Sequence, residues 1–258
     1  MRNYGIDMTD VKHIKKEMIV SYSNLSEKGG REINEDAVKV TEVDGNFCFI
    51  VCDGLGGHGK GEIASAETTE KISECFESDS KASDFFDTAF KKAQENLLEK
   101  QKEIADTSQM KTTAVVLTIT DGYAQWCHIG DSRLYFFSKA KIKERTTDHS
   151  LVQMLAIAGD IKEKEIRFHP ERNVLLKVMG SEWEGNSYVV SEKIKVKKGD
   201  SFLLCTDGFW EFINEKEMKK YCKKSLTAED WLQKMKDEVE TNSKGKDSDN
   251  YSAITVKI

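Results

Sequence analysis

Four Asp-Gly pairs divide this sequence, and two of them separate runs of β-branched and aromatic residues. Asp44-Gly45 stands between AVKVTEV and NFCFIVC, and Asp121-Gly122 stands between TAVVLTIT and YAQWCHI. Glycine readily adopts the positive φ angle of a two-residue hairpin turn, and the flanking residues favour strands. These two pairs therefore predict antiparallel hairpins.

The other two Asp-Gly pairs each follow an apolar run, but no second strand-like run comes directly after them. Asp53-Gly54 follows FCFIVC and leads into GLGGHGKGE, whereas Asp207-Gly208 follows SFLLCT and leads into FWEFI. In both places we predict a buried strand that ends on a carboxylate at the rim of a sheet. The alternative interpretation is an ordinary hairpin turn.

Helical periodicity appears in four segments of the chain. The first two have apolar stripes, Ile63, Ala66, Ile72, Cys75 and Phe76 in one and Phe86, Ala89, Phe90, Ala93, Leu97 and Ile104 in the other. A third helix is predicted from Thr227, as N-cap, through Trp231, Leu232, Met235 and Val239. A shorter helix over 150–158 is predicted to stop at Gly159. We expect these apolar positions to form core rather than ligand sites.

The last segment, SAITVKI, alternates apolar and polar residues and predicts a half-buried final strand. Strands come first, followed by two long helices, many strands, more helices and this strand. Parallel β-α-β alternation does not fit that order. Hairpins with segregated helices predict an antiparallel α+β fold.

Composition narrows the class of protein further. The chain has 258 residues with a net charge of −6, so no net positive field attracts nucleic acid. No Pro-rich or Ser/Gly-rich linker divides it, which predicts one domain over 1–258, with 1–16 as an N-terminal extension. The longest apolar run, Phe47 to Cys52, is far short of the ~20 residues of a membrane span. Six scattered cysteines without a C-x-x-C pair indicate structural thiols in a reducing compartment. We therefore expect a cytoplasmic monomer without membrane partners.

Acidic residues stand where apolar strands start or stop: Glu35, Asp36, Asp53, Asp131, Asp207 and Asp249. Carboxylates that converged would repel one another strongly unless a multivalent cation held them. Hard oxygen ligands suit Mg²⁺ or Mn²⁺, and the sequence offers no His or Cys cluster for zinc. Because turns are commonly acidic, the alternative is that these residues do not converge.

Two neighbouring features would extend such a site. Arg31 lies four residues before Glu35, and its guanidinium could bind a phosphate through bidentate hydrogen bonds. The alternative is a solvated or salt-bridged arginine. The glycine-rich run after Asp53 lacks the spacing of nucleotide-binding loops. Its glycines would instead let the main chain approach a metal, with the Gly54 carbonyl as a ligand.

Seven motifs in order carry a resemblance to a known family. They are REINEDA (31–37), VCDGLGGHGKGEIAS (51–65), TTAVVL (112–117), HIGDSRLY (128–135), TTDHSLV (146–152), GDSFLLCTDGFWE (199–211) and DNYSAITV (249–256). With them the chain resembles the metal-dependent protein serine/threonine phosphatases of the 2C type, in their compact bacterial form. The resemblance implies a four-layer αββα sandwich of two antiparallel β-sheets flanked by helices.

The resemblance also implies a metal centre at one end of the sandwich. Asp53 would bridge two Mn²⁺ or Mg²⁺ ions, Asp207 and Asp249 would complete the first, and Glu35 with the Gly54 carbonyl would bind the second. Asp131 with Asp207 would match a weaker third site. Asp36 and Asn250 would act through waters, and Arg31 would bind the substrate phosphate. The implied partners are phosphorylated proteins and a serine/threonine kinase that shares those targets.

The chain departs from the family pattern at several positions. Leu55 stands where relatives carry Met or His, and we interpret nearby His58 as a loop histidine rather than a general acid. Lys177 replaces a usual arginine, and the stretch 157–185, expected to form a flap beside the site, is the least similar. The resemblance predicts hydrolysis of phosphoserine and phosphothreonine in proteins. The alternatives are a non-catalytic binding module on the same fold and a small-molecule phosphate hydrolase.

Overall fold

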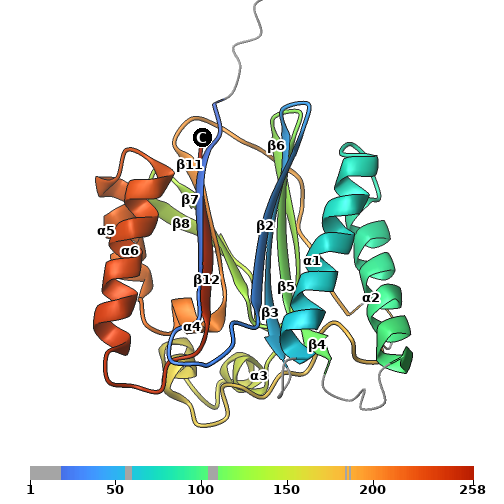
Figure 1. Ribbon diagram of the computed structural model, residues 1–258. Coiled ribbons are helices and arrows are strands. Elements are labelled where there is room, and N and C mark those ends of the chain that lie inside the picture. Colours follow the sequence, from blue (N-terminus) through green and yellow to red (C-terminus); the bar gives the residue numbers. More distant parts are fainter. Residues whose placement is uncertain (1–18, 56–59, 104–109, 184, 186) are drawn as a thin grey trace, which may run out of the picture.

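Two antiparallel sheets lie face to face in the computed structural model, and helices cover the outer face of each (Figure 1). The structure describes residues 19–55, 60–103, 110–183, 185 and 187–258; the predicted extension over 1–16, His58 and Ile104 lie outside them. The predicted α+β class and the αββα layering are confirmed.

The first sheet has the strand order β1-β12-β11-β7-β8 and the second has the order β10-β6-β5-β3-β2, with β4 paired to β3 and β9 to β6. The first contains Ser21–Glu27 (β1), Tyr251–Lys257 (β12), Asp200–Cys205 (β11), Arg133–Ser138 (β7) and Lys141–Arg145 (β8). The second contains Ile194–Lys195 (β10), Tyr123–Ile129 (β6), Ala114–Thr120 (β5), Asn46–Leu55 (β3), Asp36–Val43 (β2), Lys111–Thr112 (β4) and Val189–Val190 (β9).

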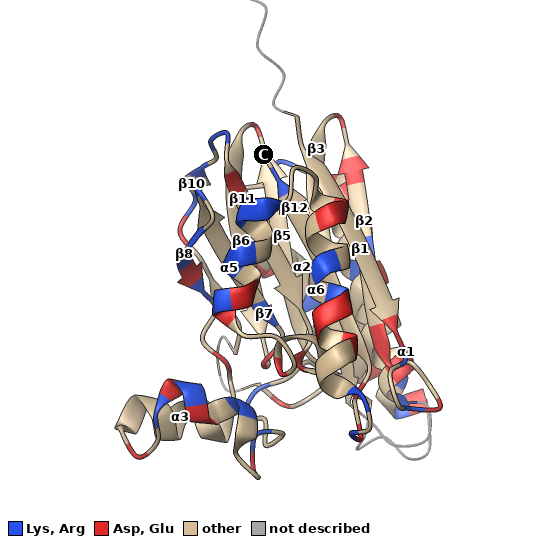
Figure 2. Cartoon of the chain, turned by 90° about the vertical axis from the view of Figure 1, so that its left-hand side faces the viewer, with Lys and Arg blue, Asp and Glu red and all other residues tan. Residues whose placement is uncertain are grey.

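Helices α1 (Lys60–Ser78) and α2 (Phe85–Glu103) cover the second sheet, while α5 (Glu215–Lys224) and α6 (Ala228–Ser243) cover the first. Two shorter helices, α3 (Leu151–Ala158) and α4 (Asp207–Trp210), and a 3₁₀ turn (Glu163–Phe168) lie at one end of the sandwich. The outward faces of α5 and α6 carry bands of both charges (Figure 2). Within the described part of the chain, every helix is too short or too polar to span a lipid bilayer.

Both predicted hairpin turns are confirmed. Asp44 and Gly45 have φ angles of 49° and 72° between β2 and β3, and Asp121 and Gly122 have φ angles of 49° and 80° between β5 and β6. Positive φ at both central residues gives the turn the twist of the strands it joins. These turns lie at the end of the sandwich opposite α3 and α4 (Figure 1).

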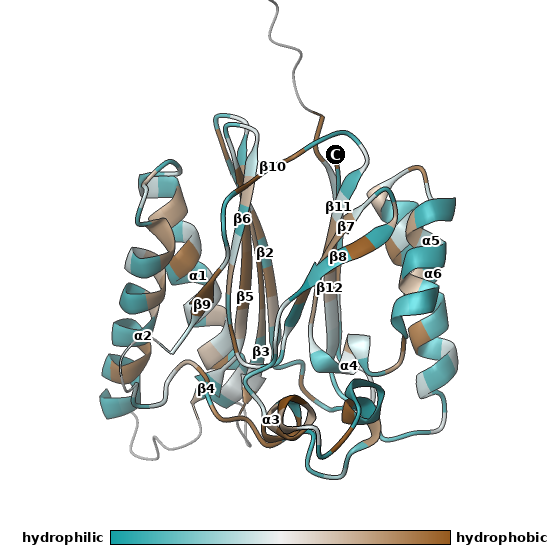
Figure 3. Ribbon diagram, turned by 180° about the vertical axis from the view of Figure 1, so that it is seen from behind, coloured by the Kyte–Doolittle hydropathy of each residue, from teal (hydrophilic) through white to brown (hydrophobic). Residues whose placement is uncertain are grey.

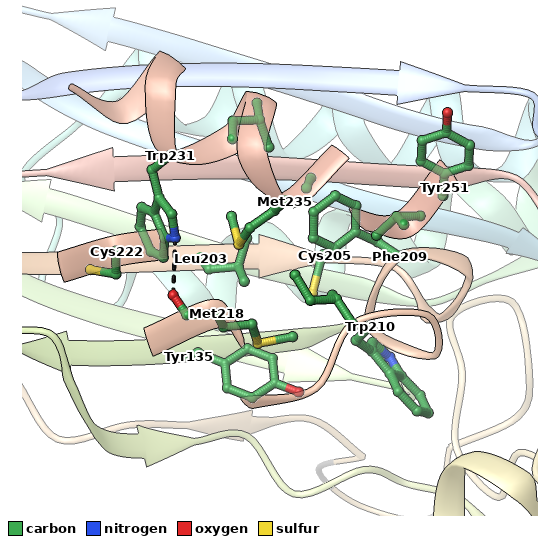
Figure 4. Close-up of a cluster of buried hydrophobic side chains, with 14 of the residues drawn as sticks. Tyr135, Leu203, Cys205, Phe209, Trp210, Met218, Cys222, Trp231, Met235 and Tyr251 are labelled. Atoms are coloured by element: carbon green, nitrogen blue, oxygen red, sulfur yellow. Dashed lines mark hydrogen bonds between the residues drawn. The ribbon is translucent and has the colours of Figure 1, made fainter. Parts of the chain in front are cut away.

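Three apolar layers hold the four structural layers together. Phe49 packs between the sheets, whereas its neighbour Ile50 packs under α1 and α2, because successive strand residues face opposite sides. The third layer joins the first sheet to α5 and α6 (Figure 4). There the Trp231 indole N–H donates to the Met218 carbonyl at 3.3 Å, which satisfies its polar atom inside the core.

Two predicted helix ends are confirmed in detail. The Thr227 side chain accepts from the Asp230 N–H at the start of α6, and Ser150 accepts from the Gln153 N–H at the start of α3. Gly159 ends α3 with a φ of 88°, a left-handed conformation that favours glycine. The short helix at 150–158 therefore has both of its predicted boundaries.

The apolar stripe predicted for the first helix is wrong in part. Ile63 and Ala66 are exposed, and α1 instead buries Ala64, Thr68 and Ser73 along with Ile72 and Phe76. The hydroxyl groups bury because α1 packs closely on β2, where Ser73 Oγ lies 2.6 Å from Thr41 Oγ1. A polar residue on this helix is thus part of its buried face.

The half-buried final strand is also a wrong prediction. β12 lies between β1 and β11, with α6 on its outer face, so its residues 251–256 are all buried. The polar member Thr255 is fully buried because its hydroxyl donates to the Ala228 carbonyl at 2.9 Å. The alternating pattern of β12 therefore reflects two buried faces, one toward α6 and one toward the other sheet, rather than one buried and one exposed face.

Candidate metal centre

Acidic side chains from both sheets meet in one pocket of about 320 Å³ at the α4 end of the sandwich. Its lining includes all seven residues predicted to bind metal or phosphate, namely Arg31, Glu35, Asp53, Gly54, Asp131, Asp207 and Asp249, together with Leu55, Asn173 and Leu175. The sequence-based interpretation that these acids converge is therefore the one the geometry supports. Asp36 and Asn250 lie directly behind the pocket.

Asp53 comes from the second sheet and is held by its main chain. β3 does not end at Asp53 as predicted, because Gly54 and Leu55 pair with the short strand β4. The Asp53 N–H donates to Thr113 Oγ1 at 3.0 Å, and the hydroxyl of Thr112 donates to the Asp53 carbonyl at 2.8 Å. These bonds leave the carboxylate as the part of Asp53 that faces the pocket.

Asp36 lies opposite Asp53 in the β2–β3 ladder. Its Oδ2 accepts a hydrogen bond of 3.0 Å from Thr206 Oγ1, which directly follows β11 of the other sheet and caps α4. Its Oδ1 is buried and has no hydrogen-bond partner. Asp36 therefore joins the two sheets beneath the pocket while keeping one oxygen unsatisfied.

Asp131 lies in the connection that carries the chain from β6 to β7, and so from one sheet to the other. The Trp210 indole N–H donates to the Asp131 carbonyl at 3.1 Å, and Ser132 Oγ lies 2.7 Å from Thr113 Oγ1. The Arg133 guanidinium stacks on the Trp210 ring at 3.4 Å from its centroid. This packing fixes the loop that presents the Asp131 carboxylate.

Asp207 and Asp249 lie in segments that adjoin strands β11 and β12 of the first sheet. Asp207 begins α4 directly after β11, and the next residue must be glycine: a β-carbon at Gly208 would lie 2.1 Å from the Asn250 carbonyl oxygen. That close approach brings the two acid-bearing segments together. Asp249 Oδ1 accepts the Asn250 N–H at 2.8 Å.

Arg31 forms an ion pair with Asp249, with Nη2 2.9 Å from Oδ2, and both side chains are nearly half exposed at the pocket rim. The loop that carries Arg31 is tied down by Asn250, whose side-chain amide donates to the carbonyls of Lys28 and Ile33, both at 2.9 Å. The Asn250 amide oxygen accepts the Glu35 N–H, also at 2.9 Å. Asn250 thus positions Arg31 and Glu35 through main-chain groups.

Glu35 lies in a cradle formed by two glycines. A β-carbon at Gly61 would lie 2.6 Å from Glu35 Oε1 and 2.8 Å from the Gly54 carbonyl carbon, so neither glycine leaves room for a side chain. Glu35 Oε1 is buried without a hydrogen-bond partner. An unsatisfied carboxylate oxygen in a buried position destabilises the fold unless a cation or donor reaches it.

Burial and mutual repulsion disfavour the charged form of these acids. Burial first, then the charges of neighbouring acids, raise the pKa of Asp207 to about 7 and that of Asp36 to about 8. The same causes raise the pKa values of Asp53 and Asp131 well above that of an ordinary aspartate. The pKa of Glu35 is raised too, chiefly by burial. Such a cluster becomes favourable at neutral pH only when positive charge is added to it.

The donor set fits a hard divalent cation, because it consists of carboxylate oxygens with the Gly54 carbonyl nearby and includes the two unsatisfied oxygens of Glu35 and Asp36. Across residues 19–55, 60–103 and 110–258 as described, however, no three His, Cys, Asp or Glu side chains have the geometry to hold one ion together. Arg31 already occupies one Asp249 oxygen that an ion would need.

Sequence reasoning missed several residues around the pocket. Asn173 and Leu175 line it from the stretch expected to form a flap, and Thr113 supports Asp53. Glu211 raises the pKa of Asp207 and is paired with Arg172 at 2.5 Å. Thr113 and Glu211 lie in the TTAVVL and GDSFLLCTDGFWE motifs, and Asn173 and Leu175 lie in the stretch expected to flank the site, but no motif assigns any of them a role there.

Comparison with known proteins places the chain in a family. A model of the family described as protein phosphatase 2C matches residues 27–242. The serine/threonine phosphatase stp of Listeria monocytogenes is 30% identical over 207 residues, covering 76% of this chain and 80% of that protein. The crystal structure of the serine/threonine phosphatase Stp1 from Staphylococcus aureus has a TM-score of 0.84 at 27% identity, covering 96% of this chain and 99% of that one.

A further structure shows the same fold with metal present in that protein. The catalytic domain of the serine/threonine protein phosphatase PstP, in complex with two manganese ions, has a TM-score of 0.80 at 21% identity, covering 92% of this chain and 97% of that one. The family match spans most of the sequence and the fold agrees throughout. The chain therefore belongs to the protein phosphatase 2C family.

Proposed function

We propose that the acidic pocket binds two divalent cations, Mn²⁺ or Mg²⁺, and hydrolyses phosphoserine and phosphothreonine in proteins. As a member of its family, the chain is a protein serine/threonine phosphatase. The observation that carries the metal proposal is the convergence of five carboxylates and one arginine in a single pocket. The two manganese ions of the PstP structure support it.

The proposed ligands follow the sequence-based assignment. Asp53 would be shared by both ions, because its carboxylate lies close enough to feel the charges of Asp207, Asp131 and Asp249. Asp207 and Asp249 would hold the first ion, and Glu35 with the Gly54 carbonyl would hold the second. Asp131 with Asp207 would hold a weaker third ion, and Asp36 and Asn250 would act behind them.

When bound, two such ions lower the pKa of a water molecule and neutralise charge on the phosphoryl oxygens. The chain itself must bind and orient the phosphate. Arg31 suits this role because its guanidinium lies at the rim, exposed, and already holds a carboxylate oxygen of Asp249. Exchange of that carboxylate for a phosphate would free Asp249 for metal and orient the substrate over the acids. Leu55 and Leu175 give the pocket an apolar border.

The proposed partners are phosphorylated proteins and the serine/threonine kinase that modifies them, and the proposed setting is a cytoplasmic monomer. The six free cysteines, five of them buried, are consistent with a reducing compartment. A membrane role for the chain is not part of this proposal.

The test is release of phosphate from p-nitrophenyl phosphate and from a phosphothreonine peptide, with Mn²⁺ and with EDTA. We expect turnover of both substrates that needs the metal, and Asp207→Ala should lose it while keeping the wild-type circular dichroism spectrum. Titration calorimetry of Mn²⁺ separates the alternatives. A binding module would show neither turnover nor tight Mn²⁺ binding, and a metabolite hydrolase would ignore the peptide.

A further inference from the structure

A second groove of about 400 Å³ lies beside the metal pocket and has no role in the chemistry above. Four large apolar side chains line it although they are strongly exposed: Met154 (52%), Ile157 (63%), Leu176 (54%) and Val189 (49%). The first two come from α3, and Val189 comes from β9. Figure 3 shows α3 and β9 as brown, hydrophobic elements. Apolar surface that is gathered in one concave place indicates a binding site.

The groove is continuous with the metal pocket. The wall between them is one extended segment, in which Asn173 and Leu175 line the metal pocket while Leu176 and Lys177 line the groove. Main-chain bonds hold that segment against the start of α3, from the Leu151 N–H to the Val174 carbonyl at 2.9 Å and from the Leu176 N–H to the His149 carbonyl at 2.8 Å. A ligand in the groove is therefore separated from the acids of the metal pocket by only this one segment of main chain.

A stacked histidine pair forms part of the groove lining and is linked to the loop that carries Asp131. His128 and His149 stack with ring centroids 4.9 Å apart and interplanar angle 9°, and both line the groove. The His149 N–H donates to the Gly130 carbonyl at 2.9 Å, directly before Asp131. The stacked rings and their main-chain bond form a preformed surface, and a preformed surface lowers the free-energy cost of binding.

The groove also lies between two open sheet edges. β8 is the last strand of the first sheet, and β9 pairs with β6 at the border of the second; Arg145 and Val189 bring both into the groove lining. Unpaired strand edges are suited to an extended polypeptide, which adds hydrogen bonds along its main chain. A small apolar molecule would make no use of them.

The charged residues at the rim of the groove favour a ligand that carries an acidic residue. Arg145 is already paired with Glu163 at 2.6 Å, whereas Lys177 forms no ion pair with any residue that the structure describes. An acidic residue on the ligand would give Lys177 its partner. A second copy of this chain seated here would cover the metal pocket, whereas a polypeptide substrate must cross it.

We infer that this groove binds an apolar side chain of the phosphoprotein substrate, with an acidic neighbour facing Lys177. The inference rests on the proposed function and specifies which phosphoproteins the site takes. The bound peptide must cross the one segment that separates the metal pocket from the groove. An extended peptide rises ~3.3 Å per residue and adjacent strands lie ~4.8 Å apart, so the apolar residue should stand about two to four positions from the phosphorylated one.

The test pairs substitutions in the enzyme with substitutions in the substrate. Phosphothreonine peptides carry a single leucine or serine at each position up to four residues on either side. The enzyme variant is Met154→Ser/Ile157→Ser, which changes exposed residues of α3. Leu226→Ser is the matched control, because Leu226 is 95% exposed and lies outside the groove. Hydrolysis of p-nitrophenyl phosphate, which is too small to reach the groove, reports the metal site alone.

We expect the wild type and Leu226→Ser to prefer one leucine position by about tenfold in kcat/KM, as burial of one aliphatic side chain predicts. The double variant should keep its p-nitrophenyl phosphate rate within twofold and lose the leucine preference. In leucine peptides that also carry aspartate or lysine at the neighbouring position, the wild type should prefer aspartate and Lys177→Glu should prefer lysine. No leucine preference in the wild type, or equal loss on both substrates, overturns the inference.

A failure of the proposed phosphatase function would give a different experimental result from a failure of the groove proposal. Absence of Mn²⁺-dependent turnover on any phosphate ester would refute the phosphatase mechanism. Fluorescence anisotropy of the same labelled peptides then decides the groove separately, since it needs no turnover. Tighter binding of the leucine peptide to the wild type than to the double variant supports the groove, and equal binding refutes it.

Discussion

Asp207→Asn should make the metal-free protein more stable at pH 8 and make the metal unable to stabilise it further. An ordinary aspartate has a pKa of 3.8, whereas burial and neighbouring acids raise that of Asp207 to about 7. Each pKa unit corresponds to about 1.36 kcal/mol, so the ionised carboxylate destabilises the metal-free fold by about 4 kcal/mol at pH 8. Asparagine keeps the shape of the side chain without the charge.

The direction of the pH dependence follows from the raised pKa. The folded protein holds the Asp207 proton more tightly than the unfolded chain, so this contribution to stability is complete below about pH 4 and is lost as the pH rises through about 7. Asp36, with a pKa raised to about 8, acts in the same direction and extends the loss to higher pH. Wild-type protein in EDTA should therefore melt at a lower temperature at pH 8 than at pH 5.

Differential scanning fluorimetry at pH 5 and pH 8, in EDTA and in Mn²⁺, tests this reasoning. Because neighbouring acids share the effect, we expect a gain of about 2–4 kcal/mol for Asp207→Asn in EDTA at pH 8, or roughly 5–15 °C in Tm. At pH 5 the gain should shrink to about 1–2 kcal/mol, because the folded protein still holds the Asp207 proton while the unfolded chain has largely lost it, and below about pH 4 the two proteins should melt together. Mn²⁺ should raise the Tm of the wild type at pH 8 and leave that of the variant nearly unchanged.

The matched control is Asp237→Asn, which removes the same charge from the exposed face of α6, where the Asp237 carboxylate accepts from Gln233 Nε2 at 2.7 Å. It should shift the Tm by less than 2 °C and keep the full Mn²⁺ effect. If Asp207→Asn lowers the Tm in EDTA at pH 8, the acids do not repel as described and the reasoning is refuted.

Three further predictions concern other parts of the site. Arg31→Ala should lower kcat/KM about 100-fold on both peptide and p-nitrophenyl phosphate, while calorimetry shows Mn²⁺ binding at least as tight as before, because Asp249 loses a competing ion pair; weaker Mn²⁺ binding would contradict this. Gly61→Ala places a β-carbon 2.6 Å from Glu35 Oε1 and should weaken Mn²⁺ binding about tenfold or more, whereas Gly199→Ala, with open space around its β-carbon, should not. Arg133→Met should lower the free energy of unfolding in urea by about 3–5 kcal/mol, since it leaves the buried Asp148 carboxylate without its 2.6 Å partner; adding Asp148→Leu should recover much of that loss.

Local sequence signals predicted much of this fold because they act over a few residues. Asp44-Gly45 fixes a hairpin through its own φ angles, and Thr227 begins a helix through its own side chain. The acids at strand ends could be identified for the same reason: each follows or precedes an apolar run. Their convergence was one of two open interpretations until the family resemblance was added.

Features that depend on distant neighbours were not predicted. Helix α5 has an apolar face of Met218, Tyr221 and Cys222 at helical spacing, but three residues in a highly charged segment were too short a pattern to be predicted as a helix; they pack against α6 and the first sheet. The hydroxyl face of α1 and the full burial of β12 likewise depend on which elements lie against them. Asn173 and Leu175 reach the metal pocket only because their segment pairs with residues near α3.

The distribution of the acids over the two sheets has a mechanical consequence. Asp53 lies in the second sheet and Glu35 directly before its strand β2, Asp207 and Asp249 lie next to strands β11 and β12 of the first sheet, and Asp131 lies in the connection between the sheets. Ions held by all of them would connect the two sheets, so the affinity for the ions would depend on how accurately the sheets are aligned. A substitution in the apolar layer between the sheets, such as at Phe49, would then weaken ion binding from a distance without altering any ligand.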